Sequence, residues 1–288
     1  MKRRMFALST LAIATAFAMS AISFAPPVSA QQSDSAIKRI QDSKKVRIGW
    51  ASWWPYAYRD PKSNNELAGA AIEMLSLMAT ALKAEPVWVE DSWATLVAGL
   101  QSNKYDLALP MGITLDRAMA GTFTEPFMQF GSGIVIRKED AQKFKSWQDI
   151  DKPGQKILVG LGSTGDMFAS RKFTKGEVVR LRTEPELLMS MVTKKADAWH
   201  STYGAFHKIL PDHPQLMIMP ATTLAITPMS FVVRQGDFHF AKWIDYFVAE
   251  IKQTGELVRI LDKHGLGEAY LMGSAIDQAA VIPPAQKN

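Results

Sequence analysis

The order of strands and helices constrains the fold of this 288-residue chain more than any other feature. Apolar strands alternate with amphipathic helices in one series, and a second series repeats the same order. The expected elements lie at 46–49, 69–83, 87–89, 92–102 and 105–109 in the first series and at 157–159, 163–172, 178–181, 185–192 and 196–199 in the second. This order implies parallel strands with crossover helices.

Two further strand-like segments, 134–136 and 231–233, connect the series, and helices at about 238–253 and 255–264 close the chain. Because no low-complexity linker separates the series, we interpret the two connections as hinge strands. The sequence therefore predicts an α/β protein with two lobes around a cleft. Each lobe is expected to have its own mostly parallel sheet, flanked by helices.

The first thirty residues have the features of a secretory signal peptide. Residues 2–4 are basic, residues 5–19 are apolar, and the sequence VSA at 28–30 fits a cleavage site. The apolar run is too short for a membrane-spanning helix. Since the chain has no cysteine, neither a lipid-attachment site nor a disulfide is expected. We expect a mature periplasmic protein.

The charge of the chain gives no sign of a nucleic-acid or membrane partner. The sequence has 33 basic and 28 acidic residues, a formal net charge of +5. Three of the basic residues lie in the leader, and the remaining 30 leave the mature chain at +2. Because no basic run follows the leader, we expect neither nucleic acid nor an anionic membrane as a partner.

An aromatic cluster, GWASWWPYAYRD at 49–60, follows the first strand. Its rings lack the regular spacing of a helix or strand face. One interpretation is a hydrophobic plug, since tryptophan is mostly buried in ordinary cores. The other is a binding wall, because ligands bind at strand-end loops and flat rings suit planar or cationic groups. We favour the wall.

The segment VGLGSTGDMF has three interpretations. Gly160, Gly162 and Gly165 form a G-x-G-x-x-G pattern between a strand and a helix, and Glu184 follows at the distance typical of dinucleotide-binding folds. Glycines at a helix N-terminus also let an anion approach the backbone amides. A plain helix cap at Ser163 is the third interpretation. We rank the anion site first, the cap second and the dinucleotide site last.

The segment GITLDR places a cation against the helix dipole. Thr114 is a suitable N-cap, which puts Arg117 in the first helical turn. Such an arginine suggests an anionic partner, because guanidinium binds carboxylate bidentately. A solvated Arg117, or one paired with Asp116, is the alternative.

No pattern indicates catalysis or metal binding. The five histidines lack the paired spacing of a zinc-binding helix. Position 161 is leucine, so the nucleophile motif G-x-S-x-G is absent around Ser163. We expect no catalytic residue, no metal ion and no cofactor.

Six segments, in their order along the chain, resemble the family-3 extracellular solute-binding proteins, the type II periplasmic receptors of polar amino-acid ABC transporters. Spread over about 45–266, they are VRIGWASWWPYAY, ELAGAAIEM, DSWATLVAGLQSNKYDLAL, GITLDRAMAGTFTEPF, GSTGD and KKADAWHS. The resemblance implies the type II periplasmic-binding-protein fold. It also implies a monomeric receptor that captures a small carboxylate-bearing solute, an amino acid or a derivative, and delivers it to an ABC permease.

The expected domain organisation is discontinuous. Its segments are 1–30 (signal peptide), 31–44 (N-terminal arm), 45–132 plus 230–270 (lobe 1), 133–229 (lobe 2) and 271–288 (C-terminal tail).

The resemblance also implies roles for residues. Arg117 would hold a ligand carboxylate from lobe 1, and the Ser163 and Thr164 amides would hold it from lobe 2. Aromatic residues of the 49–60 loop, with Trp93, would stack on the ligand. The candidate ligand-binding residues are Trp50, Trp53, Tyr56, Trp93, Met111, Gly112, Thr114, Arg117, Gly162, Ser163, Thr164 and Thr202.

The chain departs from the family where the ammonium group of an amino acid would bind. Thr202 stands where amino-acid binders carry an aspartate after the last strand of lobe 2, and residues 50–52 lack an acid that some members carry. Gly112 occupies a position where many members use serine or threonine. Either the ligand lacks a free α-ammonium, or aromatic rings hold a cation, or an overlooked acid accepts it, with Asp91 the first candidate.

Cyclohexadienyl dehydratases share this scaffold and resemble the chain across FKSWQDIDKPGQKILVGLGSTGDMFA. The position of their proposed catalytic glutamate is Ala205 here, and no acid at 201–207 could replace it as proton donor. We keep the dehydratase as the alternative function, and expect no turnover of prephenate or arogenate.

Overall fold

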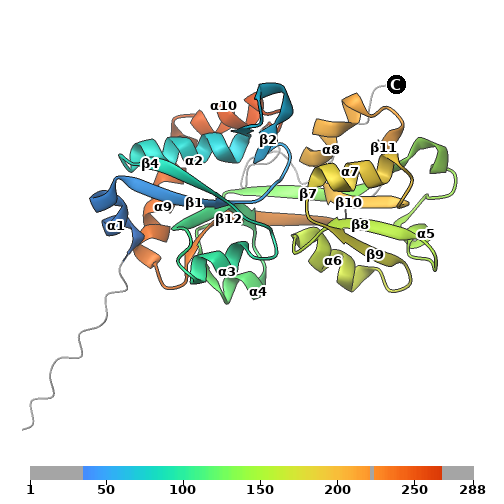
Figure 1. Cartoon of the computed structure of the whole chain (residues 1–288), viewed down its shortest axis with the longest axis horizontal. Coiled ribbons are helices and arrows are strands. Elements are labelled where there is room, and N and C mark those ends of the chain that lie inside the picture. The colour runs from blue at the N-terminus through green and yellow to red at the C-terminus, as the bar shows by residue number, and fades with distance from the viewer. Residues whose placement is uncertain (1–34, 221–223, 268–288) are drawn as a thin grey trace, which may run out of the picture. The chain divides into compact units, whose positions relative to one another are not determined.

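A mixed ten-stranded sheet carries the fold of the computed structural model, which describes residues 35–220 and 224–267. Its strands follow the order β4-β1-β5-β12-β7-β10-β8-β9, with β6 beside β12 and β11 beside β7 (Figure 1). Strands β2 and β3 form a separate pair. The strands are β1 (Lys45–Trp50), β2 (Tyr58–Asp60), β3 (Glu66–Ala68), β4 (Glu85–Glu90), β5 (Leu107–Gly112), β6 (Gly121–Phe123), β7 (Met128–Arg137), β8 (Lys156–Gly160), β9 (Glu177–Leu181), β10 (Ala198–Thr202), β11 (Leu216–Ile218) and β12 (Ala225–Arg234).

Both expected strand–helix series are present. Strand β1 pairs in parallel with β4 and β5, and β8 pairs in parallel with β9 and β10. Between these parallel groups lie β7 and β12, each of ten residues, at the positions expected for hinge strands. The prediction of a two-lobed α/β fold is confirmed.

The hinge strands differ from the expectation because they pair with each other. Residues 225–229 of β12 run antiparallel to 128–132 of β7. Hydrogen bonding therefore passes from one parallel group to the other without a break, and the prediction of a separate sheet in each lobe is wrong. Two extended segments that cross side by side satisfy their backbone donors and acceptors by pairing.

Capping side chains fix where several helices begin. Thr114, Ser163, Thr183 and Asp237 each accept a backbone N–H at a helix start. Asp237 also accepts the Ala36 amide, which anchors the first helix. The helices are α1 (Ala36–Ser43), α2 (Ala70–Ala81), α3 (Leu96–Gln101), α4 (Leu115–Ala118), α5 (Trp147–Ile150), α6 (Thr164–Lys172), α7 (Glu184–Val192), α8 (Tyr203–Ile209), α9 (Phe238–Gln253) and α10 (Glu256–Lys263), with 3₁₀ turns η1 (Pro61–Ser63), η2 (Lys138–Asp140) and η3 (Leu210–Asp212).

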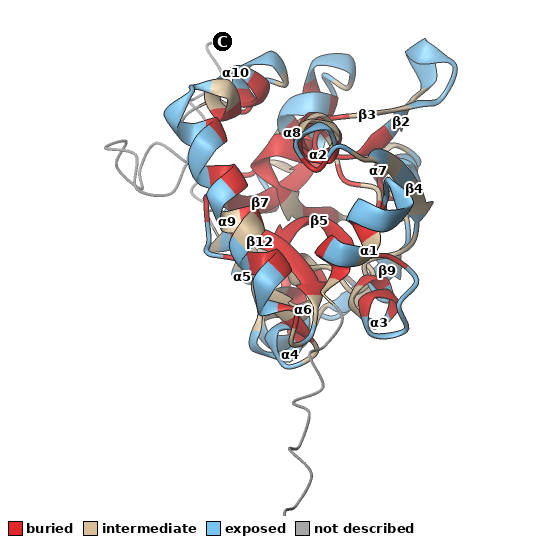
Figure 2. Ribbon diagram, turned by 90° about the vertical axis from the view of Figure 1, so that its left-hand side faces the viewer, coloured by how far each residue is buried: buried red, intermediate tan, exposed pale blue. Residues whose placement is uncertain are grey.

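The buried apolar residues divide between the two lobes. One cluster draws its side chains from residues 36–130 and 229–266. Two others, drawn from 134–219, lie on the two sides of β8, which contributes Leu158 to one and Ile157 to the other, as alternation along a strand requires. Figure 2 shows the buried residues on the strands and the sheet-facing sides of the helices.

These separate cores fit the expected lobe boundaries, 45–132 with 230–270 and 133–229, which stay a prediction. The expected signal peptide and C-terminal tail lie outside the described residues. Within 35–220 and 224–267, none of the helices combines the length and the apolar run needed to cross a membrane.

Candidate functional site

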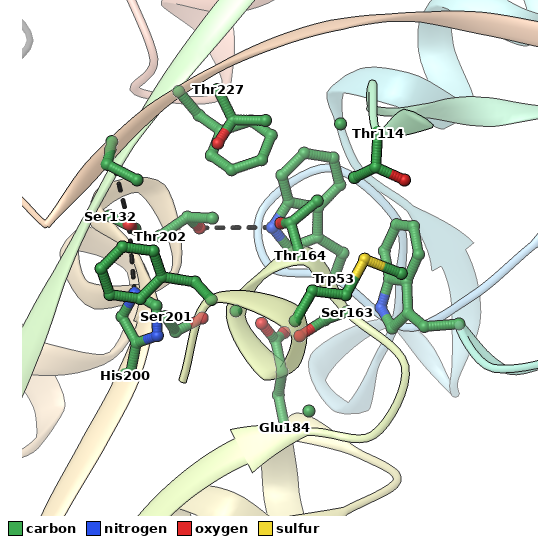
Figure 3. Close-up of a pocket in the computed structure, with 18 of the residues that line it drawn as sticks. Trp53, Thr114, Ser132, Ser163, Thr164, Glu184, His200, Ser201, Thr202 and Thr227 are labelled. Atoms are coloured by element: carbon green, nitrogen blue, oxygen red, sulfur yellow. Dashed lines mark hydrogen bonds between the residues drawn. The ribbon is translucent and has the colours of Figure 1, made fainter. Parts of the chain in front are cut away.

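A cavity of about 220 Å³ lies at the carboxyl ends of β5, β8 and β10 (Figure 3). The last residues of these strands, Gly112, Gly160 and Thr202, all line it. Open α/β sheets bind their ligands at this edge, and a volume just below the 300–1,000 Å³ of drug-sized sites suits a small metabolite. The candidate residues that line the cavity are Trp53, Trp93, Gly112, Thr114, Arg117, Ser163, Thr164 and Thr202.

Arg117 is held by backbone carbonyls of both lobes. Thr114 Oγ1 accepts the Arg117 amide and caps the four-residue helix α4, as the sequence predicted. The guanidinium donates through Nη1 to Gly112 O at 2.9 Å and through Nη2 to Gly162 O at 3.0 Å. These two bonds use part of the five N–H donors of an arginine side chain, so the others are available to a ligand.

Arg117 carries a buried positive charge without a carboxylate partner among the described residues. Only 6% of Arg117 is exposed, and no ion pair joins it to an acid in 35–220 or 224–267. The alternatives of a solvated arginine or a pair with Asp116 are therefore wrong. Burial lowers the pKa of Arg117 to about 10, which still leaves it cationic at neutral pH.

The main role of the turn before α6 is to cap that helix. Ser163 Oγ accepts the Asp166 amide at 3.1 Å, and the Asp166 carboxylate accepts the Gly162 amide at 3.0 Å. The Ser163 amide, expected to bind an anion, instead donates to Gly160 O at 3.0 Å inside the turn. The Thr164 amide begins the helix and takes no part in this turn, so it stays the candidate anion donor here.

Two glycines let the lobes approach closely. Gly162 has φ +74°, and an added Cβ would lie 2.5 Å from Ala94 Cα. At Gly112 a Cβ would lie 2.7 Å from the Thr164 side chain and 2.9 Å from that of Thr227. A serine or threonine at position 112 would therefore clash, and Gly112 contributes its carbonyl to Arg117 instead. Gly162 likewise contributes a carbonyl and does not line the cavity itself.

The aromatic wall consists of different rings from those expected. Trp53 lines the cavity with its ring edge-on to Trp93 at 5.6 Å and to Phe130 at 5.3 Å between centroids. Tyr56 stacks behind Trp53 at 3.9 Å and is fully buried. Trp53 Nε1 donates to Thr202 Oγ1 at 3.2 Å (Figure 3), so Thr202 already has a partner from the other lobe.

Three candidate residues point into the core rather than the cavity. Trp50, Tyr56 and Met111 are at most 1% exposed and belong to the lobe 1 cluster. They do not line the cavity, in contrast to the expectation. Trp50 and Met111 lie in β1 and β5 with side chains on the core face, and Tyr56 supports Trp53 from behind. The plug interpretation thus holds for part of the loop, since Trp54 also packs against a lobe 2 cluster.

Glu184 is the main residue of this site that the sequence did not assign. It begins α7 directly after its N-cap Thr183, is 6% exposed, and lines the cavity. Its carboxylate accepts the Trp54 amide from lobe 1, and burial raises its pKa to about 8. An acid in the first turn of a helix is ordinary, so its sequence gave no signal beyond the spacing already noted.

Neither Asp91 nor the position of the dehydratase glutamate supplies an acid to the cavity. Asp91 pairs with Lys104 at 2.9 Å and caps the turn before α3, and it does not line the cavity. Ala205, at the position of the dehydratase glutamate, is buried, and its amide donates to Thr202 Oγ1. Asp91 is therefore not the overlooked acid of the cavity.

His200 lies on the lobe 2 side of the cavity. Its Nε2 is 3.1 Å from Ser132 Oγ (Figure 3). Burial lowers the pKa of His200 to about 4, so the ring is neutral at physiological pH. Within the described residues no group of three or more histidine, aspartate or glutamate side chains could hold a metal ion.

Residues 46–267 match the model of the bacterial extracellular solute-binding proteins, family 3. The chain belongs to this family, and the resemblance drawn from its motifs is confirmed.

Some relatives of the chain are named as binding proteins and one is named as an enzyme. The L-arginine-binding protein of Pseudomonas aeruginosa is 27% identical over 238 residues, covering 79% of this chain and 90% of the relative. The cyclohexadienyl dehydratase of the same organism is 23% identical over 243 residues, covering 83% and 90%. Family membership therefore leaves both a binding and an enzymatic precedent.

Solved structures show the same fold. An ancestral amino acid-binding protein, described as a precursor of cyclohexadienyl dehydratase, matches with a TM-score of 0.74 and 24% identity over 80% of this chain and 99% of its own. The cysteine-binding protein of Campylobacter jejuni matches with a TM-score of 0.73 and 21% identity over 80% and 92%.

Proposed function

We propose that this protein is a periplasmic receptor that binds a small carboxylate-bearing solute, an amino acid or a derivative, and delivers it to an ABC permease. The observation that carries the proposal is Arg117, a buried cation with unused donors at the cavity and no acid paired with it in the described part of the chain. A buried unpaired charge is costly, and a ligand carboxylate would compensate it with bidentate hydrogen bonds.

The rest of the ligand would lie between the lobes. Thr164 would meet the carboxylate from lobe 2, and Trp53, Trp93 and Phe130 would cover the body of the ligand. The bonds from Arg117 to Gly162 and from Trp53 to Thr202 join residues of the two lobes. We infer that they form when the lobes close, and that β7 and β12 bend to allow it. The predicted signal peptide would export the protein to the periplasm.

The first experiment identifies the solute. The purified protein is denatured, released small molecules are identified by mass spectrometry, and the twenty standard L-α-amino acids are titrated into refolded protein by calorimetry. We expect a bound compound with at least one carboxylate and a dissociation constant that Arg117→Ala raises strongly. Binding of a neutral compound alone, unaffected by Arg117→Ala, would refute the carboxylate assignment.

A dehydratase-like enzyme is the second candidate, and one observation favours it. Glu184 is a carboxyl group that keeps its proton at neutral pH inside the cavity, as a general acid must. Against it, Ala205 stands at the position expected for the catalytic glutamate. We expect no turnover of prephenate. Turnover above background that Glu184→Gln abolishes would make the protein an enzyme with Glu184 as its acid.

A further inference from the structure

We propose that Glu184 receives a cationic nitrogen of the solute, in place of the aspartate that Thr202 replaces. This inference rests on the proposed function, since it concerns the ligand bound by Arg117. It assigns an acid to a site in which the sequence indicated none.

The position of Glu184 suits this role. Its side chain extends from the start of α7 toward the middle of the residues that line the cavity (Figure 3). The hydrogen bond from the Trp54 amide uses one of about four acceptor positions of the carboxylate. No lysine or arginine of residues 35–220 and 224–267 pairs with Glu184, so its remaining acceptor positions are open to a ligand.

No other acid of the described residues competes for the ligand. Glu184 is the single aspartate or glutamate among the cavity-lining residues that the structure describes. The neighbouring acids are engaged: Asp166 pairs with Arg180 at 2.8 Å, and Glu186 accepts the Thr183 amide in the cap of α7. Asp91 pairs with Lys104 outside the cavity. Glu184 is therefore the acid that this part of the chain offers to a ligand in the cavity.

The cavity thus offers a buried cation on one lobe and a buried acid on the other. A ligand carboxylate would compensate the charge of Arg117, and an ammonium group or another cationic nitrogen would displace the Glu184 proton and pair with the carboxylate. A dicarboxylate would leave Glu184 unpaired or protonated, so its carboxylate oxygens would accept no hydrogen bond from the ligand. The pairing favours zwitterionic solutes over simple acids.

The other charged or titratable residues among the described residues that line the cavity are Arg117, Arg171, Arg182 and His200. Arg117 stays cationic at neutral pH, and burial keeps His200 neutral. Glu184 changes charge as the pH approaches 8, because its burial raises its pKa. A cationic ligand group selects the ionised carboxylate and must release its proton at lower pH. Affinity should therefore rise with pH, by up to about tenfold per unit, until pH 8.

The test uses the standard L-α-amino acids as probes. The tightest binder in calorimetry at pH 7 is compared with the acid that lacks only its α-amino group and, for a cationic side chain, with the neutral analogue of that side chain. Each is titrated into wild type, Glu184→Gln and the control Glu186→Gln. Glutamine can still serve the cap at position 186, so the control removes a nearby charge that does not face the cavity.

We expect Glu184→Gln to lower the affinity for the amino acid by about 30-fold or more. The same variant should change binding of the analogue that lacks the recognised nitrogen by less than threefold, and Glu186→Gln should change neither. Wild-type affinity should rise from pH 6 to 8, and that slope should vanish in Glu184→Gln.

Four results would overturn the inference. Equal losses for every probe in Glu184→Gln would assign Glu184 to holding the Trp54 loop alone. Affinity that falls as the pH rises would mean that the protonated carboxyl donates to a ligand oxygen. If none of the twenty amino acids binds to wild type and no carboxylate-bearing compound is released from the purified protein, the proposed function fails together with this inference. Binding with an unaffected Glu184→Gln variant removes this inference only.

Discussion

The two lobes have the same order of strands and helices, yet they contribute to the cavity in different ways. Lobe 1 contributes loops that follow strands: Trp53 after β1, and Arg117 in the short helix after β5. Lobe 2 contributes helix starts, with Thr164 at α6 and Glu184 at α7. A repeated framework therefore positions a site without fixing its chemistry.

Burial shifts the pKa values of Arg117 and Glu184 in opposite directions. Arg117 has its pKa lowered to about 10 and keeps its charge at neutral pH. Glu184 has its pKa raised to about 8 and holds its proton there. Desolvation disfavours the charged form of both groups, but only the carboxyl group is moved across neutral pH. The lobe 2 side of the cavity should therefore be the side that senses pH.

The largest expected effect is on stability, in the absence of added solute. The folded-state pKa of Glu184 lies above its ordinary value of 4.5, so its contribution to stability is present below pH 4.5 and is lost as the pH rises through 8. Relative to Glu184→Gln, wild type should lose up to roughly 1.4 kcal/mol per pH unit across this window, a few kcal/mol in all. Urea unfolding at pH 5 to 8 measures it.

The matched control for this effect is Glu186→Gln. Hydrogen bonds from Thr183 at the helix start lower the pKa of Glu186, so its contribution is already complete above its unfolded pKa. The difference between wild type and Glu186→Gln should therefore stay constant from pH 5.5 to 8. An equally constant difference for Glu184→Gln would contradict the buried, protonated state of Glu184.

The next effect concerns the lobe 1 charge. Arg117→Ala should weaken binding of the identified solute by roughly 2–4 kcal/mol, because it removes a bidentate, desolvated contact. Arg117→Lys should recover only part of the loss, since an ammonium lacks the planar fork. Calorimetry measures both variants, with circular dichroism to confirm folding. Wild-type affinity in Arg117→Ala would remove the carboxylate assignment.

Substitution in the aromatic wall should cause a smaller loss of affinity. Trp93→Ala should cost roughly 1–3 kcal/mol of binding and reduce the change in tryptophan fluorescence on adding solute. Trp50→Phe is the matched control, because Trp50 is buried in the lobe 1 core and does not line the cavity. If Trp50→Phe weakens binding as much as Trp93→Ala, the wall extends further than the structure indicates.

The smallest effect on affinity is expected for Arg171 and Arg182, which form the exposed rim of the cavity. Arg171 and Arg182 line the cavity but are exposed, so water and salt screen their charges. Replacing either with alanine should change affinity by less than about 1 kcal/mol and slow association a few-fold at low salt. Stopped-flow fluorescence at two salt concentrations measures this. A loss as large as that of Arg117→Ala would place a second anionic group of the solute at the rim.

Local patterns in the sequence were enough to predict the framework and one half of the site. The strand–helix order predicted both parallel groups, and the caps at Thr114 and Ser163 were confirmed. Arg117 was found because a cation in the first turn of a helix opposes the dipole. Each of these signals lies within a few residues of the feature that it predicts.

The features that the sequence did not predict depend on contacts between distant segments. Glu184 is buried by the loop at Trp54, 130 positions earlier in the chain, and nothing near position 184 indicates that burial. The direction of Trp50 and Tyr56 is set by how the loop folds back on β1, and aperiodic spacing cannot predict it. The pairing of β7 with β12 likewise appears only when both hinge strands are placed together.

The central claim is that one solute links Arg117 on lobe 1 to Glu184 on lobe 2. A crystal structure of the protein with its identified solute tests this most directly. We expect a ligand carboxylate oxygen within about 3 Å of the Arg117 guanidinium and a ligand nitrogen within about 3 Å of a Glu184 oxygen. A solute bound with only apolar atoms or oxygens facing Glu184, or bound away from Arg117, would contradict the account.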